Sequence, residues 1–465
     1  MKESGMAEWR LDWERGPLTI EIPDADLRQI VTAKQPPTLG SWTDLVRSAI
    51  EAPVGAAPLR EWVRPGQRVA ILLTDVHDAI FGSKDRVGPL LLDYLNAAGI
   101  PDRNIALIHA AGLHGHGDAK ERIGPEVLNR VRYHEHDPLD EERQSFHGAT
   151  WQGTPVFANR IATECDVMIG FGGCGPSLFG FQGGAGIILP GISGADTIRH
   201  NHIKIMNSTR VISGWWPGNP QRMDVMDAGD RVGFRFKIDL TANAVFAGYF
   251  RDEWPRAVEY VKENVLTRVA PTDIYVSATP GRELANALYM HLEYGTQIVR
   301  PGGIIIICAS AAHHQYGPAR PVEETLAELI YCTRIWNAET GAGDPAVRAY
   351  LRRRDVHCKE ELMLLPLDQI SRIVSRRLGE PRSTTMSWSH KRALLSTRTF
   401  LVTEGVTPEE GERLGFAYVT GSFRDAYERA QRELGGGGQV VANVSGGSFG
   451  GVTAPAGGIP YPMHE

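Results

Sequence analysis

Short apolar segments alternate with amphipathic segments along the first half of the chain. Residues 68–73 (RVAILL), 105–109 (IALIH) and 166–171 (DVMIGF) predict buried strands, and residues 87–98 have the spacing of an amphipathic helix. Strands that alternate with helices are typical of an α/β fold with a largely parallel sheet. The pattern therefore predicts an α/β unit here.

The same alternation starts again near residue 270. Residues 273–277 (DIYVS) and 302–308 (GGIIIIC) predict strands, with a helix near residues 283–293 between them and a connecting helix at residues 253–265. We predict two α/β domains with mostly parallel sheets, at residues 1–268 and 269–465. Because ligands of such folds bind where loops leave the carboxyl ends of strands, we expect an active-site cleft between the domains.

Composition narrows the class of protein. The 465 residues are 42% hydrophobic and carry a net charge of −6, so we expect a folded protein that binds a small molecule rather than nucleic acid. No apolar run is long enough to span a membrane, and the segment MKESGMAEWR lacks the apolar core of a signal peptide. The five cysteines never form a CxxC pair, which favours reduced thiols in a cytoplasmic protein. Assembly into a homo-oligomer stays open.

Polar residues follow two of the predicted strands. Asp75, His77 and Asp78 come after residues 68–73, where carboxylates and an imidazole suit ligand binding, although an Asp-rich loop is as often a turn or a helix cap. Gly112 and His114 follow the next strand, where glycine lets the backbone approach a ligand and imidazole exchanges protons near neutral pH.

A glycine-dense passage spans residues 171–191 and includes Gly183, Gly184 and Gly186. Glycines at this density free backbone N–H groups to hold an anion, but the spacing is not that of a dinucleotide-binding GxGxxG loop. His200 and His202 follow; they would face different sides of a helix but the same side of a strand, and a structural role for either imidazole stays open.

Other polar or aromatic clusters are weaker candidates. His313 and His314 follow the second predicted strand of the second unit, and at most one of them is expected to face the cleft. Residues 383–389, which include Trp388, are Ser-rich and are expected to form a loop that covers the site.

The order of these motifs resembles the lactate racemase family, whose members use a nickel-pincer nucleotide. The matching segments, in chain order, are TDVHDA, GLHGH, FGFQGGAGIILPG, TIRHNH and NPQRMDVMDAGDRVGFRFKIDL, followed by the Tyr-containing helix before VRPGGIIII. The resemblance covers both predicted domains, and an ordered set of motifs is more specific than a single one.

The resemblance implies a racemase or epimerase that acts at a secondary alcohol carbon by reversible hydride transfer. His202 would be the nickel ligand, and imidazole is a ligand that suits nickel. His114 would transfer the substrate's hydroxyl proton, and Tyr289 and Trp388 would contact the substrate. The cofactor would be bound by a set of loop residues: Asp75, His77, Gly112, Gly183, Gly184 and Gly186.

Two departures from the family concern the cofactor and the proton-transfer groups. The lysine that tethers the cofactor covalently aligns with Gly186, so the resemblance implies noncovalent binding here. The second proton-transfer histidine aligns near Pro176 or Ser177, so another group must replace it or the reaction is one-sided.

Two further departures concern the substrate. Asp78 and Glu293 stand where the family has an arginine and a lysine for the substrate's carboxylate. Because an anion repels an acid in a low-dielectric cleft, these changes favour a neutral polyol or a cationic alcohol over a simple 2-hydroxy acid. Either carboxylate could instead be the missing base, and both are named as catalytic candidates. A net oxidoreductase or dehydratase, or a cofactor-binding protein without activity, is the alternative.

Overall fold

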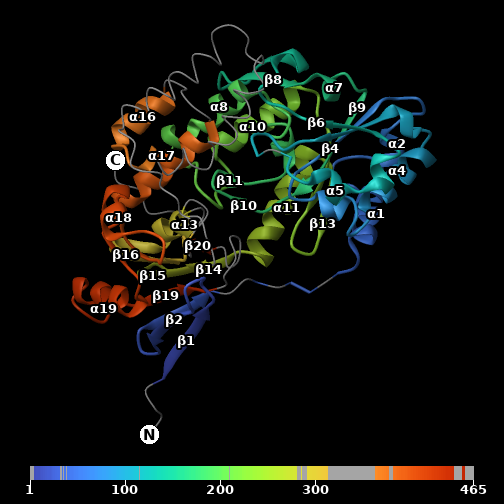
Figure 1. Ribbon diagram of the computed structural model, residues 1–465. Coiled ribbons are helices and arrows are strands. Elements are labelled where there is room, and N and C mark those ends of the chain that lie inside the picture. The colour runs from blue at the N-terminus through green and yellow to red at the C-terminus, as the bar shows by residue number, and fades with distance from the viewer. Residues whose placement is uncertain are drawn as a thin grey trace.

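The structure is a computed structural model that describes most of the chain. The described residues are 5–31, 34, 36–37, 39–114, 116–208, 210–279, 284, 288, 291–312, 362–375, 381–444 and 453–455. Figure 1 shows two α/β parts, with the N-terminal hairpin packed on the second part.

The first part is built on a six-stranded sheet with the strand order β13-β12-β9-β4-β5-β6. Neighbouring strands are parallel except β12 and β13, which are antiparallel. The strands predicted from the apolar runs are confirmed, as is the mostly parallel sheet. The bounds are β4 (Val69–Leu73), β5 (Ile105–His109), β6 (Arg132–Glu135), β9 (Val167–Gly173), β12 (Phe236–Leu240) and β13 (Val245–Tyr249).

Helices cover both faces of this sheet because its central strands are apolar on both sides. In β4, Ile71 belongs to a core with α1 (Trp42–Glu51) and α4 (Val87–Ala97), whereas Leu72 belongs to a second core on the opposite face. That second core includes residues of α8 (Ala195–His202), α10 (Pro220–Arg231) and α11 (Phe250–Asn264). The predicted helices at residues 87–98 and 253–265 are α4 and α11.

The second part contains another six-stranded sheet, with the order β18-β17-β16-β15-β19-β3 and parallel neighbours throughout. Its strand β3 comes from the beginning of the chain, so by sheet membership residues 27–31 lie with the second part and not with the predicted first domain. The bounds are β3 (Leu27–Val31), β15 (Thr272–Thr279), β16 (Val299–Ala309), β17 (Arg398–Val402), β18 (Tyr418–Thr420) and β19 (Val440–Asn443).

Shorter elements complete the fold. The helices packed on the second sheet are α13 (His291–Ile298), α17 (Pro381–Ser396), α18 (Pro408–Leu414) and α19 (Phe423–Glu433), and α16 (Leu367–Ser375) packs on α17. The remaining strands are β1 (Met6–Leu11), β2 (Leu18–Pro23), β7 (Gln144–Ala149), β8 (Pro155–Asn159), β10 (Pro176–Ser177), β11 (Gly180–Phe181), β14 (Thr267–Val269) and β20 (Thr453–Pro455). The remaining helices are α2 (Leu59–Trp62), α3 (Asp78–Phe81), α5 (Ala119–Ile123), α6 (Pro125–Leu128), α7 (Arg160–Thr163) and α9 (Lys204–Asn207), with 3-10 turns η1 (Asp102–Asn104), η2 (Glu141–Arg143) and η3 (Gly184–Ile187). Within the described part of the chain, each helix is too short or too polar to cross a membrane.

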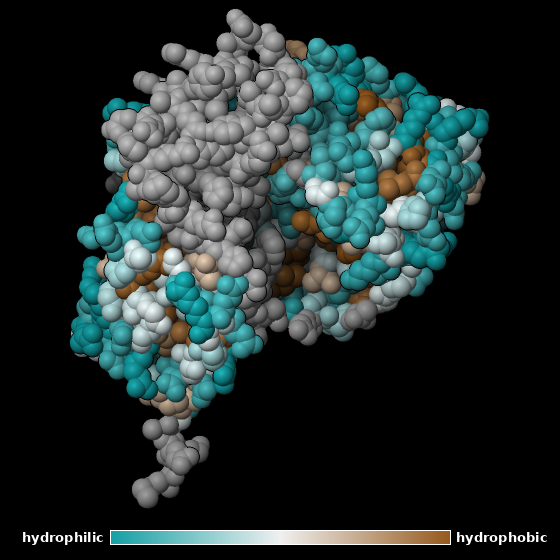
Figure 2. Space-filling view, viewed as in Figure 1, coloured by the Kyte–Doolittle hydropathy of each residue, from teal (hydrophilic) through white to brown (hydrophobic). Residues whose placement is uncertain are grey.

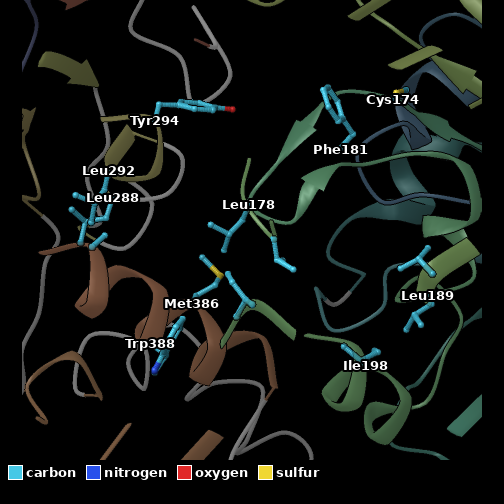
Figure 3. Close-up of a cluster of buried hydrophobic side chains, with 14 of the residues drawn as sticks. Cys174, Leu178, Phe181, Leu189, Ile198, Leu288, Leu292, Tyr294, Met386 and Trp388 are labelled. Carbon is cyan, nitrogen blue, oxygen red and sulfur yellow. The ribbon is translucent and has the colours of Figure 1, made fainter. Parts of the chain in front are cut away.

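One hydrophobic core joins the two parts. It contains Leu178, between β10 and β11, together with Met386 and Trp388 of α17, and Figure 3 shows Leu178 pointing toward Met386. A hydrogen bond from the Ser213 hydroxyl to the Tyr294 hydroxyl, 3.1 Å long, also crosses between the parts. The residues predicted to form a loop at 383–389 lie inside α17 instead, because the side chains of residues 384–389 are buried in this packed helix.

The strand ends of the first sheet lie at one edge. Leu73 is paired with both His109 and Phe171, and Gly173 with Leu240, so β4, β5, β9 and β12 end together. The loops that carry the predicted site residues leave from this edge. Figure 2 shows a recess lined partly by hydrophobic side chains near the middle of the molecule, beside the first part.

Candidate functional site

A histidine and a carboxylate from adjacent strands form a hydrogen-bonded pair at this edge. His114 Nδ1 lies 2.7 Å from Asp75 Oδ2, and the two side chains are 49% and 23% exposed. Burial acts to raise the pKa of Asp75, but the hydrogen bond from His114 and its charge outweigh burial and hold that pKa below its ordinary value. Asp75 is therefore a carboxylate near neutral pH, and its hydrogen bond fixes the imidazole of His114.

His77 lies beside the glycine-dense passage. Its Nδ1 is 3.0 Å from Thr74 Oγ1, and a Cβ on Gly173 would come within 2.5 Å of the ring, so only glycine allows this contact. Burial, with the nearby charge of Lys237, lowers the pKa of His77 to about 4. The imidazole of His77 is therefore neutral near pH 7.

Asp78 is engaged with another side chain. Arg122 donates to both of its oxygens, with two bonds of 2.7 Å, and His109 Nε2 lies 3.7 Å from Oδ2. The Asp78 side chain is almost fully buried. These contacts favour a structural role for Asp78, in which a cation balances its charge, over the predicted roles as a base or a substrate acceptor.

The glycine-dense passage turns tightly between β11 and α8. Gly183 and Gly184 both have positive φ angles, 95° and 55°, and a Cβ on Gly184 would come within 2.7 Å of the Trp254 ring. The backbone N–H of Gly184 donates to Asp239 Oδ2 over 2.6 Å. Gly112, from the β5 loop, donates its N–H to the carbonyl of Gly191 over 3.0 Å, so the two predicted loops meet.

Buried charges lie behind this passage. Lys237 Nζ lies 2.5 Å from Asp239 Oδ1, and both side chains are inaccessible to solvent. Burial raises the pKa of the neighbouring Glu253 well above its ordinary value, and the charge of Asp239 adds to this. The sequence analysis missed this group. Lys237 and Asp239 stand two residues apart in the buried strand FKIDL, so their side chains lie on the same face of the sheet. Opposite charges at this spacing in a buried strand indicate an ion pair.

His202 is the last residue of helix α8. His200 and His202 therefore face different sides of this helix, which is the outcome predicted for a helical segment. His202 is buried, and its ring centroid lies 4.4 Å from that of Phe179 in the β10–β11 hairpin. His200 instead donates from Nδ1 to the carbonyl of Asp196, 2.8 Å away. Among the described residues no three His, Cys, Asp or Glu side chains gather to hold a metal ion.

A buried polar network holds α8 in place. Asn201 donates to Asp224 Oδ2 over 2.8 Å and accepts from Gln221 Nε2 over 2.5 Å. Asp224 also accepts from Thr150 and pairs with Lys204 Nζ at 3.0 Å. This network fixes the helix that carries His202, and the sequence analysis missed it because burial of polar residues depends on tertiary packing.

The predicted residues of the second part lie in its packed helices. Glu293 of α13 is buried and accepts a hydrogen bond from Ser389. Burial raises its pKa, although the charge of Arg392 and the Ser389 hydrogen bond act against this. Trp388 donates from Nε1 to Ser371 Oγ over 2.9 Å, and its ring lies against Arg392. Tyr289, His313 and His314 lie outside the described residues.

Together the contacts bring most of the predicted loops of the first part to one place. The Asp75–His114 pair, His77 against Gly173, and Gly112 against the glycine-dense passage all lie at the carboxyl edge of one parallel sheet. This defines a class: a two-domain α/β protein whose candidate site residues gather at the carboxyl ends of parallel strands, the edge at which such folds bind ligands.

Comparison with known proteins finds similarity to lactate racemases. Residues 13–214 match the model of the lactate racemase N-terminal domain. A lactate racemase of Thermoanaerobacterium thermosaccharolyticum is 25% identical over 327 residues, which are 66% of this chain and 75% of that protein. A lactate racemase of Lactiplantibacillus plantarum is 25% identical over 282 residues, 58% of this chain and 66% of that protein.

Solved structures agree on the fold. The lactate racemase apoprotein of T. thermosaccharolyticum has a TM-score of 0.73 at 19% identity, with 96% of this chain and 100% of that chain covered. A crystal structure of a Thermotoga maritima protein has a TM-score of 0.56 at 14% identity, with 89% and 98% covered. The chain is thus similar in sequence to lactate racemases, with the match to the family's N-terminal domain confined to residues 13–214, and it shares the fold of the lactate racemase apoprotein.

Proposed function

We propose that this protein is a racemase or epimerase that acts at a secondary alcohol carbon by reversible hydride transfer, with a noncovalently bound nickel-pincer nucleotide. The observation that carries the proposal is the meeting of three groups at one sheet edge: the Asp75–His114 pair, the glycine-dense passage and the His77 loop. His202 adds a buried imidazole against the β10–β11 hairpin that leads into this passage.

The residues present fit such a cofactor. His202 offers one imidazole nitrogen to nickel, and Gly186, whose missing Cβ would have only Arg222 within 4 Å, leaves room for a ligand beside the passage. Gly186 has no side chain that could form a covalent bond, so the nucleotide must be held by noncovalent contacts. When bound, this cofactor supplies a carbon centre that accepts and returns a hydride.

His114 is the proposed proton-transfer residue. Because Asp75 accepts the Nδ1 proton, Nε2 is the nitrogen left to take a proton from a substrate hydroxyl. The carboxylate of Asp75 also stabilises the imidazolium that forms when His114 takes the proton. Half of the His114 side chain is accessible, so a substrate can reach it.

The charges of Asp78 and Glu293 bear on the substrate. Asp78 is neutralised by Arg122, and the raised pKa of Glu293 favours its uncharged form. Neither carboxyl group therefore repels an acid as strongly as a lone buried anion would. We propose a secondary alcohol as the substrate class. Because Arg122 balances the charge of Asp78 and burial raises the pKa of Glu293, the expected repulsion of a hydroxy acid by these two carboxyl groups is weakened.

Nickel and nucleotide content tests the proposal. The protein is produced together with the enzymes that make the cofactor, and the purified protein is analysed for nickel and by native and denaturing mass spectrometry. We expect nickel with a nucleotide that is retained in the native spectrum and released on denaturation. We expect His202→Ala to lose nickel, whereas the matched control His200→Ala, two residues away on the same helix, retains it.

The kind of reaction is tested with a substrate deuterated at the alcohol carbon. Direct hydride transfer predicts that the product keeps the label at that carbon, and exchange of the label with water would indicate proton abstraction instead. Absence of both nickel and nucleotide from wild type, with His202→Ala indistinguishable from it, would end the proposal.

A further inference from the structure

Arg222 is a buried cation in the first turn of α10. The residue is 4% exposed, and its side chain passes Gly180 on the way to the glycine-dense passage. Its Nη2 donates to the carbonyl of Gly183 over 2.7 Å, and its guanidinium carbon lies 4.7 Å from the centre of the Trp254 ring. The guanidinium is therefore held in one place by a carbonyl and an aromatic face.

The charge of Arg222 is not matched by an anion. Among the described residues no carboxylate forms an ion pair with it; Nε is buried without a hydrogen bond, and the side chain donates only through Nη2. The nearby Asp239 is already bound to Lys237 and to the N–H of Gly184. Burial accordingly lowers the pKa of Arg222 to about 10. Buried charges are costly unless they are paired, and the largely buried cations Lys204 and Lys237 of the same part are each paired with a carboxylate.

Gly186 leaves room beside this guanidinium. A Cβ on Gly186 would lie 3.4 Å from Arg222 Nη1, so any side chain at this position would occupy the space next to it. Gly186 follows Gly183, whose carbonyl holds Nη2. The glycine thus keeps one edge of a fixed guanidinium open, and a guanidinium edge suits the two oxygens of a carboxylate.

We propose that Arg222 and the turn Gly183–Gly186 form a binding site for a carboxylate or thiocarboxylate group of a small organic ligand. The inference rests in part on the proposed function, which supplies two sources of this group: an untethered acidic arm of the cofactor, or the acid group of a substrate. In either case the positive charge of Arg222 would attract the acid group. For the cofactor, this attraction would hold an arm that Gly186 cannot bind covalently.

The experiment measures binding of defined probes to the purified, cofactor-free chain by calorimetry. The probes are pyridine-3,5-dicarboxylate for the cofactor arm, its neutral diamide as a control, and lactate for the substrate acid. The variants are Arg222→Met, which keeps the stem against Trp254, Arg222→Lys, which keeps the charge, and Arg231→Met as a matched control at the exposed end of α10.

We expect wild type and Arg231→Met to bind the dicarboxylate and not the diamide. Arg222→Met should bind the dicarboxylate at least about tenfold more weakly than wild type, because a charge-assisted hydrogen bond is lost. The affinity of Arg222→Lys should lie between those of wild type and Arg222→Met. The same pattern with lactate alone would support the site with the substrate as the source. Equal binding by folded Arg222→Met, or no binding of either acid by wild type, would overturn the inference. If Arg222→Met does not fold, Arg222→Lys decides in its place.

Copurification distinguishes this inference from the proposed function. Native mass spectrometry should show less retained nucleotide on Arg222→Met than on Arg231→Met. Wild type without nickel but with Arg222-dependent acid binding would refute the proposed function alone. If wild type and Arg222→Met retain the nucleotide equally and bind the acids equally, the acid-binding site is refuted while the proposed function stands.

Discussion

His136 shows how one buried residue makes stability depend on pH. Its Nε2 donates to the carbonyl of Ser193 over 3.0 Å, and its Nδ1 accepts from Asn159 Nδ2 over 3.2 Å. The amide of Asn159 cannot turn around without losing the bond that its oxygen accepts from the N–H of Ala162. The neutral imidazole therefore satisfies both neighbours, whereas a second ring proton would face a donor. Burial lowers the pKa of His136 to about 4.

This predicts acid destabilisation with a definite sign. In the unfolded chain a histidine takes up its proton near pH 6.5, so between about pH 6.5 and pH 4 the unfolded state binds more protons than the folded state. Above about pH 6.5 His136 is neutral in both states and its titration does not affect stability. As the pH falls to about 4, proton uptake by His136 in the unfolded chain lowers the free energy of unfolding by on the order of 3 kcal/mol. Urea denaturation across this range checks the effect.

The variant His136→Gln isolates this residue. It removes the titrating ring, so the fall in stability between pH 7 and pH 4 should be smaller than in wild type. Its stability at pH 7 is lower for a different reason, the loss of packing, and only the slope against pH bears on the prediction. Equal slopes would show that His136 titrates normally.

At the scale of elements, helix α8 depends on its polar contacts with α10. Asn201 is fully buried and links Gln221 and Asp224 across the two helices. Asn201→Ala leaves the amide of Gln221 without this acceptor, so we expect a loss of about 2 to 3 kcal/mol in the free energy of unfolding. Chemical denaturation measures it, and Met223→Ala, at an exposed position of α10, is the control and should change stability by less than about 0.5 kcal/mol.

The same substitution should weaken metal binding through helix position. Asn201 precedes His202, so a loosened α8 holds the imidazole less firmly. Nickel content per folded chain should fall in Asn201→Ala and not in Met223→Ala. Loss of stability with unchanged nickel content would separate the network from the proposed metal ligand.

At the scale of the whole molecule, the two parts share one core. Leu178 lies in this core with residues of α17, so neither part can keep its packing when the other unfolds. We expect one cooperative transition in calorimetry, and two resolved transitions would contradict a shared core.

Leu178→Ala tests the shared core directly. The buried side chain is removed from the contact between the parts, so we expect a loss of about 2 to 5 kcal/mol and still a single transition at lower temperature. Leu395→Ala, on the exposed side of α17, is the matched control and should leave the transition almost unchanged.

The sequence predicted the local elements well, because hydrophobic periodicity records which face of each element is buried. The strands predicted at residues 166–171 and 273–277 correspond to β9 (Val167–Gly173) and β15 (Thr272–Thr279). Periodicity could not reveal partners far apart in the chain. The bond of Asp78 to Arg122 and the position of Arg222 behind Gly183 arise only when distant segments pack, so the charges that shape the site could not be predicted.

The placement of β3 has a consequence for how the protein is made. This strand ends at Val31, and its partner in the sheet is β19, which begins at Val440. A ribosome therefore produces the edge strand of the second sheet about 400 residues before the neighbour with which it pairs. Until β19 has been made, the hydrogen-bonding groups of β3 must stay hydrated or be shielded by a chaperone, and the second sheet cannot be completed.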